Sequence, residues 1–231
     1  RLFKARAFLS NDDCPAVSLI VAAYNEEKVI EGRIRNCLAL DYPKDKLEII
    51  IASDGSTDAT AEIARKYANE GVVLHAYPQR RGKVNVLNET VPRVKHSIVL
   101  FSDANTMFTR QAVKKLVRHF ADPNIGCVCG GLQFISAEGS TTGELEGIYW
   151  RYEIFLKKME GKRGALLGAN GAIFAIRKEL YQPLESDTII EDFVLPMRIL
   201  QKGFACLYAP DASAIEEAAH NGKFPSALER F

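Results

Sequence analysis

The feature that most limits what this chain can fold into is the alternation of short, almost wholly apolar runs with longer segments of helical period. Val17–Ala23 reads VSLIVAA and Leu47–Ala52 reads LEIIIA. Strands with so few polar positions are buried on both faces, which is typical of a parallel sheet covered by helices. Between them, Glu27–Leu40 places apolar residues at helical spacing. We therefore predict an α/β fold with a mostly parallel central sheet and helices on both faces.

The same two patterns continue along the chain and give the order of elements. Further strands are expected at 72–76, 97–101, 126–134, 172–177 and 205–208, and further helices at 59–68, 83–91, 111–120, 144–159 and 192–201. Residues 15–122 have the regular alternation of a doubly wound, Rossmann-like half, whereas residues 123–231 are less regular and mixed. Because no linker or internal repeat separates the halves, we predict a single domain over residues 1–231.

Composition excludes several other classes of protein. The chain has 30 Lys and Arg against 29 Asp and Glu, a net charge of +1, and this balance gives no reason to expect a nucleic acid as partner. An odd number of scattered cysteines is typical of reduced thiols in a cytosolic protein. The pair Cys127 and Cys129 has no further His or Cys at the spacing of a zinc site, so we expect buried thiols.

The ends of the chain suggest a piece of a longer protein. It opens on Arg1 and stops at Phe231 within a polar stretch. No apolar run approaches the roughly 18 residues that a membrane-spanning helix needs. That expectation applies only to these 231 residues.

Polar residues gather where the predicted strands end or the next helix begins. The segments are Tyr24-Asn25-Glu26-Glu27, Ser53-Asp54-Gly55-Ser56-Thr57-Asp58, Arg80-Arg81-Gly82-Lys83 and Ser102-Asp103-Ala104-Asn105. In open α/β sheets, ligands bind outside the carboxyl ends of the strands. Carboxylates there could hold a divalent cation, and Lys83 with helix N-termini could hold phosphate. The sequence therefore predicts a binding site at this edge.

Each segment taken alone also has a simpler structural explanation. Asp58 is favoured as a cap of the helix that follows it, Arg81 to Lys83 could be a solvated turn, and Asp103 could be a turn residue. The convergence of four polar segments on one edge favours the binding site. Common nucleotide motifs do not fit, because no Gly-X-Gly-X-X-Gly follows the first strand and Gly82-Lys83 is not part of a P-loop.

In order and spacing, the four segments resemble the nucleotide-sugar site of glycosyltransferase family 2, whose members have the GT-A fold. Two later segments, Gly168-Ala169-Asn170-Gly171-Ala172 and Glu191-Asp192, resemble the acceptor side of that family. The resemblance runs from about Pro15 to Glu217. It implies a nucleotide-sugar-binding half over residues 15–122 and an acceptor-binding half over residues 123–231.

The resemblance also implies roles for individual residues. The donor would be bound by Ala22, Tyr24, Glu26, Asp54, Lys83, Ser102 and Asp103, with Asp54 on the base and Lys83 on the base or diphosphate. The acceptor would be bound by Gly168, Ala169, Asn170 and Glu191, and Asp192 corresponds to the general base. Mg²⁺ or Mn²⁺ would be held by Asp103 and Asn105. Asn105 replaces the second acid of the family's Asp-X-Asp, so we expect either weaker metal binding or a metal held largely by the diphosphate itself.

The implied function is inverting, metal-assisted transfer of a sugar from a nucleotide sugar, typically a UDP-sugar, to a hydroxyl of a glycan or lipid-linked glycan. A carboxylate such as Asp192 would take the proton of that hydroxyl. Family members often have flanking membrane segments, which implies a place on the cytoplasmic face of a membrane. The Gln-X-X-Arg-Trp segment of processive members has no match, because the chain ends about where it would begin.

Structural explanations remain open on the acceptor side too. Asp192 could be an acid at a helix start, and Gly168 and Gly171 could serve turns. The aromatic residues of the predicted helix 144–159 are expected in the core rather than on a sugar platform; they are Tyr149, Trp150 and Tyr152.

Two other functions compete with sugar transfer. Asp54-X-Ser56-X-Asp58 is close to the metal site of von Willebrand A-like domains, which would make the chain a metal-dependent binding module without catalysis. That interpretation leaves Arg81 to Lys83 and Glu191-Asp192 unexplained. A nucleotidyltransferase would carry a Gly-rich basic loop after the first strand, where this chain has the acidic Tyr24-Asn25-Glu26-Glu27.

Overall fold

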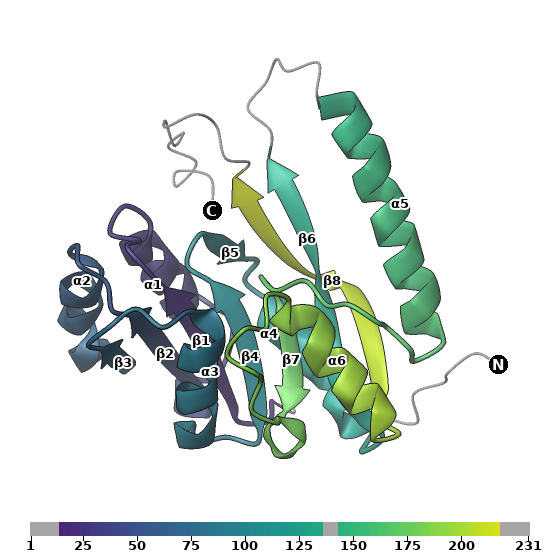
Figure 1. Cartoon of the computed structure of the whole chain (residues 1–231), viewed down its shortest axis with the longest axis horizontal. Coiled ribbons are helices and arrows are strands. Elements are labelled where there is room, and N and C mark those ends of the chain that lie inside the picture. The colour runs from purple at the N-terminus through teal and green to yellow at the C-terminus, as the bar shows by residue number, and fades with distance from the viewer. Residues whose placement is uncertain (1–13, 136–142, 218–231) are drawn as a thin grey trace.

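The computed structural model describes residues 14–135 and 143–217, with the side chains of residues 135, 143–150 and 217 excepted, and an eight-stranded sheet runs through it (Figure 1). The strands lie in the order β3-β2-β1-β4-β7-β6-β8-β5. Their bounds are β1 Val17–Ala23, β2 Leu47–Asp54, β3 Val72–Tyr77, β4 Ile98–Asp103, β5 Thr106–Phe108, β6 Ile125–Ile135, β7 Phe174–Arg177 and β8 Ala205–Glu217. The predicted fold class is confirmed.

The first four strands form a parallel unit whose carboxyl ends share one edge. β1 pairs in parallel with β2 and with β4, and β2 pairs in parallel with β3. In this register Ala23 lies beside Ser53, and Ala22 lies beside Asp103. The later strands are mixed, as expected, because β7 runs antiparallel to both β4 and β6 while β8 runs parallel to β6.

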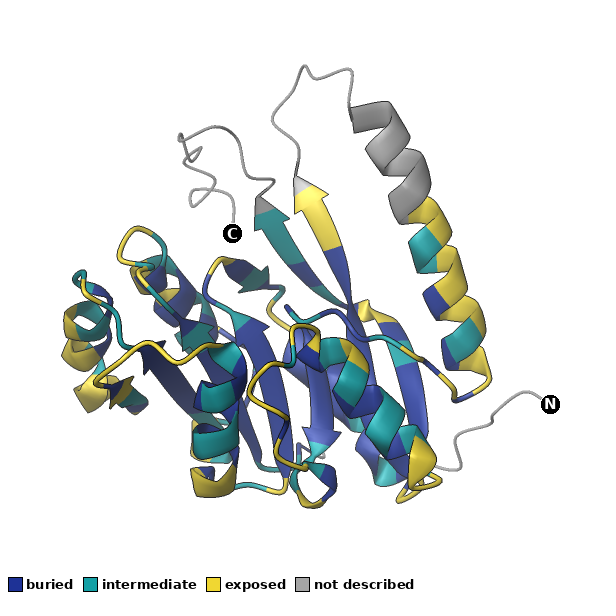
Figure 2. Ribbon diagram, in the orientation of Figure 1, coloured by how far each residue is buried: buried dark blue, intermediate teal, exposed yellow. Residues whose placement is uncertain are grey.

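Helices cover both faces of the sheet, and each face has its own apolar core. The helices are α1 Ile30–Leu38, α2 Thr60–Lys66, α3 Lys83–Thr90, α4 Ala112–Val117, α5 Gly143–Lys162 and α6 Glu191–Gln201. Leu19 of β1 belongs to the core that α1 and α4 complete, whereas its neighbour Ile20 belongs to the core that α3 and α6 complete. Successive side chains of a strand point to opposite faces, so an apolar run supplies both cores. Figure 2 shows the buried central strands between partly exposed helices.

Several predicted boundaries were wrong, each for a local reason. Helix α1 begins at Ile30 rather than Glu27, because Asn25 is left-handed (φ 54°) and the main-chain N–H groups of Glu26 and Glu27 donate to side chains of residues 58–60. Strand β8 continues past Pro210 because a register shift against β6 absorbs the irregularity. The three-residue strand β5 has too few residues for a pattern.

The expectation for the aromatic residues of α5 was wrong for Tyr152, whose side chain is exposed, while the side chains of Tyr149 and Trp150 lie outside the described residues. The cysteine prediction is confirmed, since Cys127 and Cys129 are free thiols in the core. Within the part of the chain that the structure describes, no helix is long and apolar enough to cross a bilayer.

Candidate active site

The polar segments meet, as predicted, around a cavity at the carboxyl ends of β1, β2 and β4 and the start of α3. The cavity is lined by Ala22, Ala23, Tyr24, Asp54, Arg80, Gly82, Lys83, Val86 and Asp103. Five of the predicted donor-binding residues therefore lie on its wall. Ser102 instead lies beneath it, fully buried, and Glu26 lies near Asp103, whose charge adds to burial in raising the pKa of the Glu26 carboxyl.

Asp54 fixes the basic turn that forms one wall of this cavity. Its two carboxylate oxygens accept hydrogen bonds from the main-chain N–H groups of Arg81, at 2.7 Å, and of Gly82, at 2.8 Å. This basic turn also places the Arg80 guanidinium 4.1 Å from the centre of the Tyr24 ring. A guanidinium stacked on an aromatic ring forms a flat, cationic wall. Arg80 was absent from the predicted donor-binding residues, although it belongs to the predicted polar segment.

Gly55 allows the basic turn to approach strand β2 closely. Its φ is +63°, and a Cβ added to it would lie 2.3 Å from the main-chain nitrogen of Arg80 and 2.4 Å from the main-chain carbon of Gln79. Both obstacles are backbone atoms, so a side chain at this position could fit only if the turn moved. Only glycine satisfies the conformation and the contact together.

We expect Gly55→Ala to destabilise the protein by about 3 kcal/mol or more, because it adds backbone overlap to an unfavourable φ. Gly71→Ala is the matched control, since Gly71 has φ +90° but a Cβ added to it would meet no other atom within 4 Å. The control should cost only about 1 kcal/mol. Urea unfolding of both variants measures the difference, and equal costs would show that the close approach to Arg80 contributes nothing.

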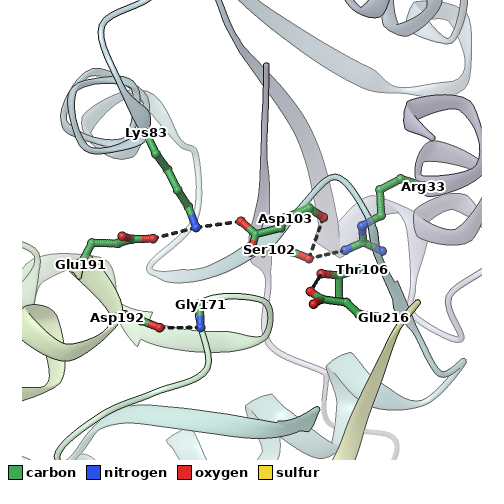
Figure 3. Close-up of polar contacts among 9 residues, drawn as sticks. All are labelled: Arg33, Lys83, Ser102, Asp103, Thr106, Gly171, Glu191, Asp192 and Glu216. Atoms are coloured by element: carbon green, nitrogen blue, oxygen red, sulfur yellow. Dashed lines mark hydrogen bonds and ion pairs between the residues drawn. The ribbon is translucent and has the colours of Figure 1, made fainter. Parts of the chain in front are cut away.

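Lys83, the first residue of α3, joins the two sides of the site (Figure 3). Its Nζ lies 2.7 Å from Asp103 Oδ1 at the end of β4 and 2.7 Å from Glu191 Oε1 at the start of α6. Burial works against the charge of Lys83, but the two carboxylates outweigh it and hold the pKa of the ammonium well above its ordinary range. A single cation thus bridges carboxylates that are far apart in sequence.

Asp192 is held beside this bridge by the segment that precedes β7. Its Oδ2 accepts the main-chain N–H of Gly171 at 2.9 Å, and its main-chain oxygen accepts the N–H of Ala169 at 2.8 Å. A Cβ on Gly171 would lie 3.2 Å from Asp192 Oδ2 and 3.7 Å from Lys83 Nζ, so the glycine keeps this crowded point open. Burial and the neighbouring Glu191 charge raise the pKa of Asp192, which makes it a stronger base than an ordinary aspartate.

The remaining acceptor-side residues are braced from behind by β6 and α5. Asn170 is buried, and its side-chain amide donates to the main-chain oxygen of Gly130 at 2.8 Å, while its main-chain N–H donates to Cys129 Sγ at 3.0 Å. The Gly168 carbonyl accepts a hydrogen bond from Lys157 Nζ at 2.9 Å. The Asn170 amide and the Gly168 carbonyl therefore hold the shape of the segment.

Asp58 was expected to be the N-cap of α2, but Ala59 holds that position, and Asp58 lies one residue earlier, where it supports both the Glu27 turn and the first residue of the helix. Its Oδ1 accepts the main-chain N–H of Thr60 at 3.0 Å, and its Oδ2 accepts the N–H of Glu27 at 3.0 Å. Asp58 is absent from the lining of the cavity.

The oxygen atoms of Asp103 and Asn105 are the kind of donor that Mg²⁺ or Mn²⁺ prefers, but by themselves they would be an incomplete set of ligands. Asn105 is exposed on the turn after β4, two residues beyond Asp103. Among the described residues, no group of three or more His, Cys, Asp or Glu side chains could hold a metal by itself. Mg²⁺ is commonly bound by one or two carboxylates together with substrate phosphates. The Lys83 ammonium already occupies a position between two carboxylates, which shows that this point favours positive charge.

Two residues near Asp103 escaped the sequence analysis. Arg33 of α1 is fully buried behind β4, and Glu216 near the end of β8 accepts a hydrogen bond from Thr106 Oγ1 (Figure 3). Burial, together with the charge of Asp103, raises the pKa of Glu216. A signal for Arg33 was available, because it shares the apolar face of its helix with Ile30, Ile34 and Cys37. Glu216 gave none, since its strand was expected to end at Tyr208.

The curated proteins that resemble this chain include synthases of one polysaccharide from two staphylococci. The chain is 29% identical over 205 residues to the poly-beta-1,6-N-acetyl-D-glucosamine synthase of Staphylococcus aureus, covering 86% of this chain and 49% of the relative. It is 28% identical over 202 residues to the enzyme of the same name from Staphylococcus epidermidis, covering 85% of this chain and 48% of that relative. The chain thus spans about half the length of these relatives.

Solved structures with the same fold include two that were determined with a nucleotide sugar bound. The mannosyltransferase PcManGT from Pyrobaculum calidifontis, in complex with GDP-Man and Mn²⁺, matches with a TM-score of 0.79 and 24% identity over 95% of this chain and 62% of that one. S. aureus TarS 1-349, in complex with UDP-GlcNAc, matches with a TM-score of 0.68 and 17% identity over 91% of this chain and 62% of that one. These likenesses bear out the expected GT-A fold and do not favour a von Willebrand A-like module.

The family model described as glycosyl transferase family 2 matches residues 18–184, a span that runs from β1 through the cavity and the bridge lysine to the segment beyond β7. This match, the curated relatives and the shared fold agree with one another. The chain belongs to glycosyl transferase family 2.

Proposed function

We propose that this chain is the catalytic part of a glycosyltransferase that moves a sugar from a nucleotide sugar to an acceptor hydroxyl. The observation that carries the proposal is the Lys83 bridge, with Asp103 at one end and Glu191, next to Asp192, at the other. Asp103 lines the cavity proposed for the nucleotide, and Asp192 is a half-buried carboxylate that follows Glu191 directly at the start of α6. Both sides of a transfer reaction therefore meet within one set of polar contacts.

The donor we propose is a UDP-sugar. Support comes from the names of the relatives, which are synthases of an N-acetyl-glucosamine polymer, and from TarS, which was solved with UDP-GlcNAc. In this arrangement Tyr24 and Arg80 flank the base, and Asp54 keeps the turn of residues 80–83 in place beside it. The N-terminus of α3, with Lys83 on it, faces the diphosphate, where a positive dipole end and an ammonium both favour negative charge.

Asp192 acts as the general base in the proposed reaction. Its carboxylate takes the proton of the acceptor hydroxyl while the hydroxyl oxygen attacks the anomeric carbon and the bond from that carbon to the diphosphate oxygen breaks. Attack opposite the leaving group inverts the anomeric configuration. A bound Mg²⁺ or Mn²⁺ near Asp103 and Asn105 would supply additional positive charge to the departing diphosphate. Lys83 places a further positive charge beside it.

The acceptor we propose is a hydroxyl of a glycan or lipid-linked glycan at the cytoplasmic face of a membrane. Support comes from the curated relatives, whose name describes synthesis of a polysaccharide. Gly168, Ala169 and Asn170 form the segment that lies against Asp192, and they would border the acceptor. The proposed membrane attachment lies in segments flanking this chain.

Titration calorimetry tests the donor proposal directly. We expect UDP to bind in the presence of Mn²⁺ and to bind at least about tenfold more weakly after the metal is chelated, because the diphosphate then loses a counter-charge. GDP is the matched control for base selection and should bind more weakly than UDP. If the folded chain binds neither nucleotide under any metal condition, the proposal is wrong. Tighter binding of GDP than of UDP would instead move the donor to another class of nucleotide sugar.

A further inference from the structure

Arg33 is a buried cation that lacks a carboxylate partner of its own. The solvent-exposed fraction of Arg33 is 0%. Among the described residues, no Asp or Glu forms an ion pair with it. The Nε atom is buried without any hydrogen-bond partner. Burying a charge is costly unless something nearby compensates it, so such a residue needs an explanation beyond packing.

The hydrogen bonds of Arg33 lead to the segment that carries Asp103. One guanidinium nitrogen, Nη2, donates to Ser102 Oγ at 2.9 Å, and the other, Nη1, donates to Asn36 Oδ1 at 2.6 Å (Figure 3 shows the first). The guanidinium carbon also lies 4.3 Å from the centre of the Phe108 ring. Arg33 therefore contacts both ends of residues 102–108, the span that contains the Asp103 turn.

Asn36 completes this attachment from the same face of α1. Its side-chain nitrogen donates to the main-chain oxygen of Phe108 at 2.9 Å, and its side-chain oxygen accepts the main-chain N–H of Phe108 at 2.8 Å. Residues three apart on a helix are neighbours on its surface. Together, Arg33 and Asn36 hold the turn between β4 and β5 from behind, on the side away from the cavity.

The charge of Asp103 also acts on Arg33. Burial lowers the pKa of the Arg33 guanidinium, and the Asp103 carboxylate opposes that shift. The carboxylate lies between this cation behind it and Lys83 in front of it. Burial and the charge of Asp103 raise the pKa of Glu26 and of Glu216, so several carboxyl groups gather around Asp103.

We propose that Arg33 is a positioning residue that holds the Asp103 turn in the form that binds a metal-bound nucleotide diphosphate. This inference rests on the proposed function. Arg33 lies outside the cavity lining, so its effect reaches the donor through Ser102 and Asp103. Groups that orient a metal ligand from behind typically change metal affinity by 10- to 100-fold when they are removed.

The proposal predicts that replacing Arg33 weakens UDP binding without lowering the thermal stability of the unliganded protein. Arg33→Met keeps most of the volume and removes the charge. Ser102 Oγ would keep its contact with the Asp103 main-chain oxygen, and Asn36 Oδ1 would keep the Phe108 N–H. Because neither partner is left without a hydrogen bond, and because the variant no longer buries a charge that has no ion pair among the described residues, we expect the thermal midpoint of the unliganded protein to stay within about 2 °C or to rise.

Calorimetry with UDP and Mn²⁺ tests the inference. Arg33→Met should bind UDP about tenfold more weakly in the presence of Mn²⁺, whereas metal-free UDP binding should change less than about threefold. Arg33→Lys, which keeps the charge, should recover part of the loss. Arg35→Met is the matched control, since Arg35 lies on the same helix in an exposed pair with Glu31 and should change neither quantity.

The outcomes distinguish this inference from the proposed function. If the unsubstituted chain binds no UDP, the proposed function fails and the inference with it. If the unsubstituted chain binds UDP with Mn²⁺ and Arg33→Met binds it equally well, only the inference fails. A drop of many degrees in the thermal midpoint of both Arg33→Met and Arg33→Lys, with equal loss of metal-bound and metal-free UDP, would also overturn it, because Arg33 would then serve packing alone.

Discussion

Asp192→Asn should lower sugar transfer by about 10³-fold while leaving UDP affinity within about twofold of its original value. An amide cannot take the proton of the attacking hydroxyl at any pH near neutrality. Its oxygen can still accept the main-chain N–H of Gly171, so the segment beside it should keep its shape. The measurement is steady-state transfer by the full-length enzyme with its own acceptor, together with UDP calorimetry of both forms.

The control for this variant is Asp187→Asn, which changes an exposed carboxylate five residues earlier in the chain. It should leave transfer unchanged. The pH profile gives an independent readout: burial and Glu191 raise the pKa of Asp192, so activity of the unsubstituted enzyme should fall on acidification at a higher pH than an ordinary aspartate would produce. Retention of more than a tenth of the activity in Asp192→Asn would assign the base to another residue.

Asp103→Asn should remove most of the metal-dependent part of UDP binding and reduce transfer by about 10²-fold or more. The substitution removes the carboxylate proposed to hold the metal. It also removes the ion pair between Asp103 and Lys83, and the Lys83 ammonium then keeps only its ion pair with Glu191. Calorimetry with and without Mn²⁺ measures the first effect. We expect the two titrations of the variant to become nearly the same.

Asp41→Asn is a matched control for Asp103→Asn. It breaks a comparable Asp–Lys pair, Asp41 with Lys114 at 3.0 Å, on a surface away from the cavity. The control should leave the Mn²⁺ dependence intact. If Asp103→Asn keeps that dependence as well, the metal is held by the diphosphate and by other oxygens, and Asp103 serves only to anchor Lys83.

The parallel half of the fold could be predicted because its signals are local. The apolar runs of β1, β2 and β4 are each long enough to be recognised from their own residues, and the polar segments that follow them must share an edge once the strands are parallel. The positions of Tyr24, Asp54, Lys83 and Asp103 around one cavity follow from that geometry alone. Their roles stay predictions until the experiments above are made.

The supports behind the site could not be predicted, because they join residues that are distant in sequence. The hydrogen bond from Arg33 to Ser102 spans 69 residues, and that between Thr106 and Glu216 spans 110. No spacing rule relates such positions. β8 continues through Pro210, a residue that usually interrupts a strand, whereas the strand was predicted to end at residue 208, and Glu216 was therefore placed outside the sheet. Asp54 lies on the cavity wall, as predicted. Its hydrogen bonds to the turn of residues 80–83, however, depend on a close approach of two backbone segments at Gly55, and no local sequence pattern predicts that approach.

The place of β7 in the sheet limits how this enzyme could be rebuilt from parts. By sequence β7 belongs with the acceptor-side segment, yet it is hydrogen-bonded to β4, with the Phe174 and Phe101 rings stacked at 4.6 Å between centres. A fragment that ended at residue 122 would leave one edge of β4 without a hydrogen-bonded neighbour. Such an exposed edge can pair with a second copy of the chain and cause aggregation. If the donor-binding halves of two relatives were exchanged, β7 would therefore have to be exchanged together with β4. The unit that recombination can move is then made of two separate stretches of the gene.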